Sequence, residues 1–348
     1  MDRSAAIPSG ADRAPIWVHD YQLALVPSAI RRRQPDARIG FFLHIPFPPA
    51  SILAQLPWRR ELLAGMLGAD AVGFQTHDDV AHFRAAAQRF AGATIAGDRL
   101  QWNGRRIRTD AHPIGIDHDA FAATARETAV ADEARALRDR LDGRRILLGV
   151  DRLDYTKGIR ARLKAFETLI ERRPATAEDT VFLQVAVPSR EAASGYAETR
   201  NEIERLVGHL NGRFGRFGRV PVQYHYGRLD RRALVAHYRA ADVMVVTPPR
   251  DGMNLVALEF VASRVWNRGV LVLSEFAGAA KLLRSALLVN PYDVDGMADA
   301  YETALAMPPD AQRQRMRRLR AQVRRHDVFR WARRAVAAFA PPPDDPAP

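Results

Sequence analysis

Short apolar runs alternate along the chain with longer segments in which apolar residues recur at helical spacing. Residues 16–19, 38–44 and 69–75 predict strands, because they are rich in apolar and β-favouring side chains. Residues 22–33 and 78–90 predict amphipathic helices. This alternation is typical of βαβ units with a parallel sheet, although it supplies fewer strands than a full Rossmann unit contains.

The alternation restarts after a break near Leu141 to Arg144. Helices are predicted at residues 159–171 and 191–210. The strands predicted in this second part are residues 145–151, 180–187, 222–225, 242–247, 269–274 and 286–290. Strands and helices in this order make a complete doubly wound domain.

The patterns therefore predict an α/β protein with two Rossmann-like doubly wound domains, the first of them incomplete. A length of 348 residues agrees with two domains. We expect residues 1–143 to form the first domain and residues 144–326 the second. Residues 327–340 predict a helix that crosses back onto the first domain, and the proline-rich tail at 341–348 is expected to be disordered.

The composition excludes several kinds of chemistry. The chain has no cysteine, which rules out disulfides, thiol catalysis and cysteine metal sites. No apolar run approaches the roughly 18 residues of a membrane helix. Residues Met1 to Pro15 lack the apolar core of a signal peptide, so we expect a cytoplasmic protein with no membrane partner.

The formal net charge is +12, but its distribution does not favour nucleic acid. The only lysines are Lys157, Lys164 and Lys281, and the many arginines are dispersed along the chain. The densest basic stretch, residues 313–325, contains no aromatic residue that could stack on bases. We therefore expect no nucleic-acid partner. A basic cleft for phosphorylated substrates needs only a few of these charges.

The segment from Gly149 to Gly158 lies where a predicted strand ends and a helix begins. In doubly wound sheets this edge faces the ligand crevice, and the free N–H groups of a helix N-terminus favour anions. Arg152 and Lys157 would add two cations, which suits a diphosphate. The alternative interpretation is a surface loop with solvated charges, because the spacing alone has low specificity.

A second strand-to-helix junction runs from Thr247 to Glu259. Pro248 and Pro249 end the strand, and Asp251 is a suitable N-cap residue. Glu259 follows about two turns later among apolar neighbours, where its carboxylate can accept both hydroxyls of a ribose. The alternatives are a simple N-cap role for Asp251 and an exposed helix charge for Glu259.

Two polar residues follow strands in the first part of the chain. His44 ends an apolar strand before a proline-stiffened loop, so it can contact a sugar hydroxyl or assist charge development at a leaving group. Asp20 follows the strand at residues 16–19 and suits a hydroxyl-rich acceptor. A structural histidine and an N-cap aspartate are the alternative interpretations.

These four segments, together with Val187–Arg190 and Leu273–Ala280, resemble glycosyltransferase family 20, the trehalose-6-phosphate synthase family. The match runs in order from about Ile16 to Trp331. The resemblance implies a GT-B fold, in which the active site lies between two Rossmann-like domains.

The resemblance also implies the residues of a donor site. Arg152 and Lys157 match the positions that hold the donor diphosphate, and Glu259 matches the position that binds the ribose. The remaining donor-binding candidates at the nucleoside end are Leu229, Asn254, Leu255 and Val256. Leu229 departs from the family, which often has an aromatic residue beside the base.

Catalytic and acceptor residues follow from the same resemblance. Asp251 and His44 match residues beside the transferred glucose and are the catalytic candidates. Asp20 and Arg190 match residues that hold glucose 6-phosphate. The implied reaction moves glucose from UDP-glucose, or another nucleoside-diphosphate glucose, to glucose 6-phosphate with retention, and needs neither a metal nor another cofactor.

Departures from the family leave alternatives open. The chain has only about fifteen residues before Ile16, where family members carry a first strand and a glycine-rich phosphate loop. A truncated, non-catalytic sugar-nucleotide binder and a start site placed too late both account for this. Another acceptor, such as glycerol 3-phosphate or a cyclitol phosphate, also agrees with the residues. The donor base and the oligomeric state are open, with a homo-oligomer among the alternatives.

Overall fold

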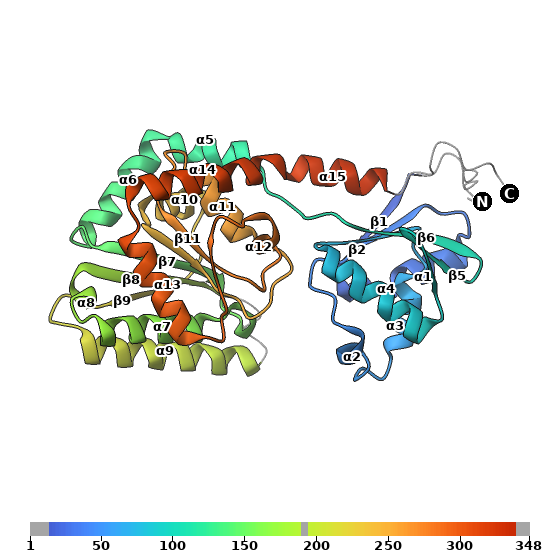
Figure 1. The fold of residues 1–348 in the computed structure, drawn as a ribbon, viewed down its shortest axis with the longest axis horizontal. Coiled ribbons are helices and arrows are strands. Elements are labelled where there is room, and N and C mark those ends of the chain that lie inside the picture. Colours follow the sequence, from blue (N-terminus) through green and yellow to red (C-terminus); the bar gives the residue numbers. More distant parts are fainter. Residues whose placement is uncertain (1–13, 189–193, 339–348) are drawn as a thin grey trace, which may run out of the picture. The chain divides into compact units, whose positions relative to one another are not determined.

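The computed structural model describes residues 14–188 and 194–338, which divide into two compact units. Unit 1 contains the described residues up to Ile114 together with those from Val328 onward. Unit 2 contains Gly115–Asp327. Each unit has its own sheet and its own hydrophobic core (Figure 1). The expected fold class, an α/β protein with two doubly wound sheets, is confirmed.

The sheet of unit 1 has the strand order β1-β2-β3-β6-β5-β4. The strands are β1 (Ile16–His19), β2 (Ile39–Phe42), β3 (Ala71–Phe74), β4 (Thr94–Ala96), β5 (Arg99–Trp102) and β6 (Arg105–Ala111). Strands β1, β2, β3 and β6 run parallel, whereas β4, β5 and β6 form an antiparallel meander at one edge. The three parallel strands predicted from the sequence are confirmed, and the meander was not predicted.

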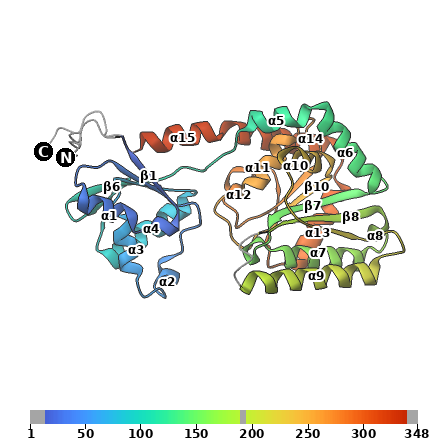
Figure 2. The ribbon, with the colours of Figure 1, turned by 180° about the vertical axis from the view of Figure 1, so that it is seen from behind.

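Helices cover both faces of this sheet. They are α1 (Val26–Arg33), α2 (Ala50–Leu53), α3 (Arg59–Met66), α4 (His77–Ala91) and α15 (Val328–Ala337). Figures 1 and 2 show α1, α3 and α4 on one side and α15 on the other. The predicted helix at residues 22–33 begins only at Val26, because Tyr21–Leu23 form a separate 3-10 turn. Helix α4 begins with a capping box between Thr76 and Asp79.

The sheet of unit 2 is entirely parallel, with the order β12-β11-β10-β7-β8-β9. Its strands are β7 (Arg145–Arg152), β8 (Thr180–Val187), β9 (Val222–Tyr226), β10 (Val243–Val246), β11 (Val270–Ser274) and β12 (Leu287–Val289). All six match strands predicted from the sequence. The strand order reverses between β7 and β10, and ligands of doubly wound sheets bind outside the carboxyl ends of the strands at such a point.

Ten helices surround this sheet within the described part of unit 2. They are α5 (His118–Arg126), α6 (Thr128–Arg140), α7 (Ile159–Arg172), α8 (Thr176–Asp179), α9 (Ser194–Phe214), α10 (Arg231–Ala240), α11 (Leu255–Ser263), α12 (Ala279–Leu282), α13 (Val294–Ala306) and α14 (Pro309–Arg325). Helices α7, α9 and α13 lie on one face, and α10, α11 and α14 lie on the other (Figure 2). The division at Ile114 and Gly115 falls earlier than the expected boundary at residue 143, because α5 and α6 pack on α10 and α11.

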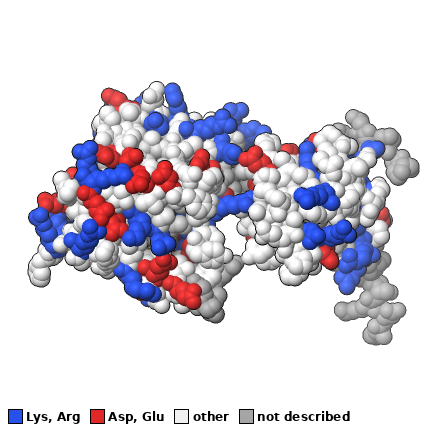
Figure 3. All heavy atoms as spheres, turned by 60° about the horizontal axis from the view of Figure 1, so that its bottom comes forward, with Lys and Arg blue, Asp and Glu red and all other residues white. Residues whose placement is uncertain are grey.

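Opposite charges are mixed on the surface. Figure 3 shows one face, on which acidic and basic side chains of unit 2 alternate. Arg172, for example, pairs with Asp295 at 2.6 Å and with Asp299 at 2.7 Å. Among the described helices, none is both long enough and apolar enough to cross a bilayer.

Candidate functional site

Three loops meet at the carboxyl ends of β7, β10 and β11 in unit 2. The loop after β10 carries Asp251, whose N–H donates to the carbonyl of Phe276 at 3.3 Å. In return, the N–H of Gly278 donates to the carbonyl of Asp251 at 3.2 Å. A Cβ on Gly278 would stand 1.9 Å from the carbonyl oxygen of Gly252, so only glycine allows this approach. The loops after β10 and β11 are therefore joined at the backbone.

The loop after β7 reaches the same point through Gly158. This residue has φ of +70°, in the left-handed region that favours glycine. A Cβ at this position would lie 2.2 Å from the carbonyl oxygen of Thr247 and 3.0 Å from Pro249. Glycine thus allows the segment that carries Lys157 to lie directly against the end of β10.

Lys157 and Asp251 form an ion pair at this junction. Lys157 Nζ lies 2.6 Å from Asp251 Oδ2, and the side chains are only 14% and 17% exposed. The Asn254 amide donates to the same carboxylate oxygen at 3.1 Å. The pair is partly shielded from water, where charges interact more strongly than in bulk solvent. The ammonium is thereby held where the loops after β7 and β10 meet.

Arg162, which sequence reasoning missed, connects the ends of the two central strands. Its guanidinium is fully buried and pairs with Asp151 at the end of β7. It also donates to Thr247 Oγ1 at 3.2 Å and to the carbonyl oxygen of Lys157 at 3.2 Å. An arginine on the apolar face of α7, beside Leu163, was the available signal. Arg162 fixes the backbone of the loop that presents Lys157.

Glu259 lies on α11 and accepts a hydrogen bond from a buried tyrosine. Tyr238 Oη donates to Glu259 Oε2 at 2.9 Å. Burial raises the pKa of the Glu259 carboxyl, while the bond from Tyr238 acts in the opposite direction. Glu259 as a whole residue is partly buried, on a helix that begins at the carboxyl edge of the sheet. These features suit hydroxyl binding better than an idle surface charge.

The other donor candidates occupy the same edge of the sheet. Arg152 ends β7 and is exposed, and Leu229 is partly buried in the loop between β9 and α10. Leu255 and Val256 form the first turn of α11, where Asn254 is the N-cap and accepts from Ala257 N. Each of these residues, like Lys157 and Glu259, lies in unit 2.

Unit 1 brings a second set of predicted residues together. His44 N donates to Asp20 Oδ1 at 3.4 Å, and the N–H of Asp20 donates to the carbonyl oxygen of Phe42 at 2.8 Å. His19, which was not singled out from the sequence, lies with its Nδ1 3.0 Å from His44 Nε2. One imidazole must donate and the other accept, so the tautomers of the pair are linked. His19 directly precedes Asp20 at the strand end, which was the signal available.

Aromatic rings surround this histidine pair. Trp17 lies 4.4 Å from the His19 ring, and Phe42 lies 4.8 Å from the His44 ring, between centroids. Trp331, from α15, packs against Trp17 at 5.1 Å. Burial lowers the pKa of both histidines, and the nearby Asp20 partly offsets this. The pair therefore favours the neutral state, which suits hydrogen bonding rather than a fixed positive charge.

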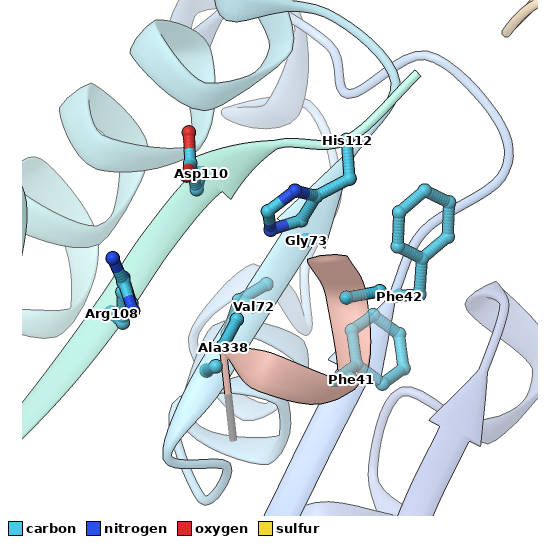
Figure 4. Close-up of a pocket in the computed structure, with 10 residues that line it drawn as sticks. Phe41, Phe42, Val72, Gly73, Arg108, Asp110, His112 and Ala338 are labelled. Carbon is cyan, nitrogen blue, oxygen red and sulfur yellow. The ribbon is translucent and has the colours of Figure 1, made fainter. Parts of the chain in front are cut away.

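A small pocket in unit 1 lies between the sheet and the end of α15. Figure 4 shows it beside His112, Gly73 and Phe42, with Ala338 from the chain after α15. Its volume is about 10 Å³, which is barely the space of one water molecule. It is a packing gap and not a ligand site. Elsewhere in the described chain, no three His, Asp or Glu side chains cluster as a metal ion would require.

Arg190 lies outside the residues that the structure describes, so its predicted position remains a prediction. The other predicted residues fall into two sets, each within one unit. Asp20 and His44 adjoin each other in unit 1, and Lys157 contacts Asp251 in unit 2. No single sequence window predicts these contacts, because each joins the ends of separate strands.

Comparisons with known proteins give the family. The family model described as glycosyltransferase family 20 matches residues 5–340. Trehalose-6-phosphate synthase of Mycobacterium sp. (strain KMS) is 49% identical over 346 residues, covering 97% of this chain and 71% of that protein. The trehalose-6-phosphate synthase of Mycobacterium avium (strain 104) is also 49% identical, over 95% of this chain and 70% of its own length.

Solved structures agree with this. An alpha,alpha-trehalose-phosphate synthase (UDP-forming) from Burkholderia xenovorans, in complex with glucose-6-phosphate, matches with a TM-score of 0.90 and 39% identity, over 94% of this chain and 73% of that one. An E. coli structure described as trehalose-6-phosphate bound with UDP-2-fluoro glucose matches with a TM-score of 0.91 and 37% identity, over 94% and 73%. The chain belongs to glycosyltransferase family 20.

Proposed function

We propose that the protein is a retaining glycosyltransferase that moves glucose from UDP-glucose to glucose 6-phosphate and so forms trehalose 6-phosphate and UDP. The observation that carries this proposal is the Lys157–Asp251 pair at the carboxyl edge of the unit 2 sheet, in a chain 49% identical to trehalose-6-phosphate synthases over nearly its whole length. The relatives with solved structures hold glucose-6-phosphate or a UDP-glucose analogue, which supports the same pair of substrates.

The donor diphosphate would bind at the end of β7. Arg152 and Lys157 supply two cations there, and Arg162 holds the backbone carbonyl of Lys157. When the bond from the anomeric carbon to the diphosphate oxygen breaks, negative charge grows on that oxygen. Cations already fixed at this position stabilise the charge without reorganisation during the reaction. Asp251, bonded to Lys157, would lie beside the transferred glucose.

The nucleoside would lie against α11. The Glu259 carboxylate, oriented by Tyr238, suits the two ribose hydroxyls. Leu229, Leu255 and Val256 offer apolar side chains for the base.

The acceptor would bind through residues of unit 1 and through Arg190. Asp20 suits the hydroxyls of glucose 6-phosphate, and Arg190 suits its phosphate. A neutral His44 would hydrogen-bond a hydroxyl of the donor glucose. Because the Asp251 carboxylate is held by Lys157 and Asn254, the acceptor hydroxyl and not a carboxylate would attack the anomeric carbon, from the face that the diphosphate leaves. Its proton would pass to the departing diphosphate oxygen.

A coupled assay of UDP release tests the proposal. With UDP-glucose as donor, we expect release with glucose 6-phosphate and none with glucose alone, glycerol 3-phosphate or a cyclitol phosphate. If UDP is released only with another phosphorylated acceptor, the enzyme makes a product other than trehalose 6-phosphate. Tight UDP binding without release for any acceptor would identify a sugar-nucleotide binder instead. The cytoplasmic location and a homo-oligomer remain predictions.

A further inference from the structure

A second cavity lies in unit 2 at the amino ends of the strands, and we call it the amino-edge cavity. It is lined by Asp242, which immediately precedes β10, and by Gly269, which immediately precedes β11. A strand as short as β10, with 4 residues, still spans about 13 Å. The cavity and the predicted donor residues are therefore at opposite edges of one sheet. Its volume is about 830 Å³, within the range of small-molecule sites.

The lining of the amino-edge cavity is strongly cationic. Among the described residues, it includes five arginines and one carboxylate: Arg138, Arg239, Arg264, Arg268, Arg313 and Asp242. Asp242 pairs with Arg138 at 2.5 Å, and Asp310 pairs with Arg313 from outside the lining. The guanidinium groups therefore outnumber these two carboxylates. Burial, with repulsion from Arg138, Arg239 and Arg268, lowers the pKa of Arg264 to about 10.

Hydrogen bonds hold the walls of the cavity in place. Arg264 donates to the carbonyl oxygens of Tyr238 at 2.7 Å and Arg239 at 2.8 Å, and also to that of Arg268. Gln312 of α14 accepts from the N–H of Gly269 at 2.9 Å. The ends of α10, the loop before β11 and α14 are thereby joined. A ligand would not have to order the Arg264 side chain or the backbone of these walls on binding, which favours affinity.

An aromatic side chain stands at the rim of this cationic lining. Trp266 is 52% exposed, and the guanidinium of Arg239 lies 4.0 Å from its ring centroid. An exposed indole beside several arginines can stack with a base while the arginines bind phosphate oxygens. We propose that the amino-edge cavity binds a nucleoside polyphosphate, with its phosphates on the arginines and its base on Trp266. This site is separate from the proposed donor site and does not rest on it.

Calorimetric titration with ATP tests the proposal. The titration uses the full chain carrying Arg152→Ala and Lys157→Ala, so that ATP binding at the proposed donor site is weakened. Arg268→Glu is then added to this chain. The Arg268 side chain is exposed in a loop, and the hydrogen bond from Arg264 goes to the backbone carbonyl oxygen, which the substitution keeps. We expect ATP at a stoichiometry of one, and a dissociation constant at least about tenfold higher with Arg268→Glu.

The matched control is Arg205→Glu, which makes the same change of charge at an exposed position of α9. It should leave ATP affinity within about twofold, and both variants should keep the thermal midpoint of the parent. An equal loss of ATP affinity in the two variants would show that overall charge causes the effect, and it would overturn the proposed site. No ATP binding by the parent chain would overturn it as well. Because Arg268 is remote from Lys157, either failure leaves the proposed transferase activity untouched.

The contribution of the base is tested with tripolyphosphate. Trp266→Leu should weaken ATP binding severalfold and leave tripolyphosphate binding unchanged, because only ATP has a ring to stack. If Trp266→Leu lowers the affinity for both probes equally, or for neither, the assignment of the base to Trp266 is wrong.

Discussion

Asp20 has a backbone conformation that residues other than glycine rarely adopt. Its φ is 69° and its ψ is 166°, which costs of order 1–3 kcal/mol for a residue with a side chain. The side chain accepts from His44 N at 3.4 Å, a long bond that does not by itself offset such a cost. Strain of this kind persists at functional residues, which agrees with a role for Asp20 in binding the acceptor.

Asp20→Gly should therefore stabilise unit 1 and disable the enzyme. Relief of strain exceeds the entropic cost of glycine, about 0.5–1 kcal/mol, so the free energy of unfolding should rise by about 1 kcal/mol. Turnover with glucose 6-phosphate should fall at least about tenfold, because a charge-assisted hydrogen bond is lost. Denaturant unfolding and the UDP-release assay measure the two effects.

Asp20→Asn is the control for this prediction. Asparagine tolerates positive φ about as well as aspartate, so it should leave stability within about 0.5 kcal/mol while activity still falls. A glycine variant less stable than the parent would show that the conformation of Asp20 is not strained.

Lys157 offers a second test at the scale of one residue. Lys157→Ala removes a charge-assisted contact worth about 1.5–3 kcal/mol and leaves Asp251 to repel an anionic ligand. The dissociation constant of UDP should rise tenfold or more. Lys164→Ala is the control, since Lys164 is a partly exposed lysine of α7 whose partner, the buried Glu167, keeps His209 and Arg213 as further partners. Unchanged UDP affinity in the Lys157 variant would show that Lys157 does not bind the diphosphate.

At the scale of elements, the loop between β7 and α7 depends on one glycine. Gly158→Ala combines an unfavourable positive φ, which costs about 1–2 kcal/mol, with a Cβ only 2.2 Å from Thr247 O. The loop must move, so both stability and UDP affinity should fall, the latter severalfold or more.

Gly208→Ala should change stability in the opposite direction, because a Cβ inside α9 at Gly208 meets nothing within 4 Å. It should stabilise the protein by about 0.5–1 kcal/mol, as chemical denaturation can show.

The sequence predicted elements with continuous apolar patterns and missed those without them. All six strands of unit 2 were predicted; β7, β8, β10 and β11 are buried apolar runs, whereas β9 and β12 are only partly buried. Strands β4, β5 and β6 were missed, because Arg99, Arg105 and Arg108 interrupt any such run in a region that pairs as an antiparallel meander. Their pairing depends on local turns and on β3 and not on apolar residues alone.

The site could be predicted in part for the same reason. Lys157, Asp251 and His44 lie in the loops that follow the apolar strands β7, β10 and β2, a position that the sequence reveals. The partners of Arg162 and Trp331 could not be predicted, because they come from other parts of the fold: Arg162 binds Asp151 from a facing helix, and Trp331 returns from the last helix to pack on Trp17. The same holds for the partnership of His19 with His44.

At the scale of the whole molecule, partly buried histidines link stability to pH. Burial lowers the folded-state pKa of His19 and His44, and likewise that of His112 in unit 1 and His237 in unit 2. In the unfolded chain these groups titrate near 6.5. As the pH falls below that value, the unfolded state binds protons first, and the folded state loses stability until its own histidines are protonated. Well above 6.5 the histidines are neutral in both states and their contribution is constant.

The free energy of unfolding from urea titrations should therefore decline between pH 7.5 and pH 5.5. His19→Gln should make this decline smaller, because it removes one partly buried histidine whose pKa is lowered by burial and by His44. His77→Gln, at an exposed position at the start of α4, should leave the decline as it is in the parent. A decline of equal slope in all three proteins would assign the pH dependence to carboxylates or to the remaining histidines. A steeper decline in His19→Gln would contradict this prediction. It would mean that the folded protein takes up a proton more readily with both imidazoles than with His44 alone, although the pKa of both histidines is lowered.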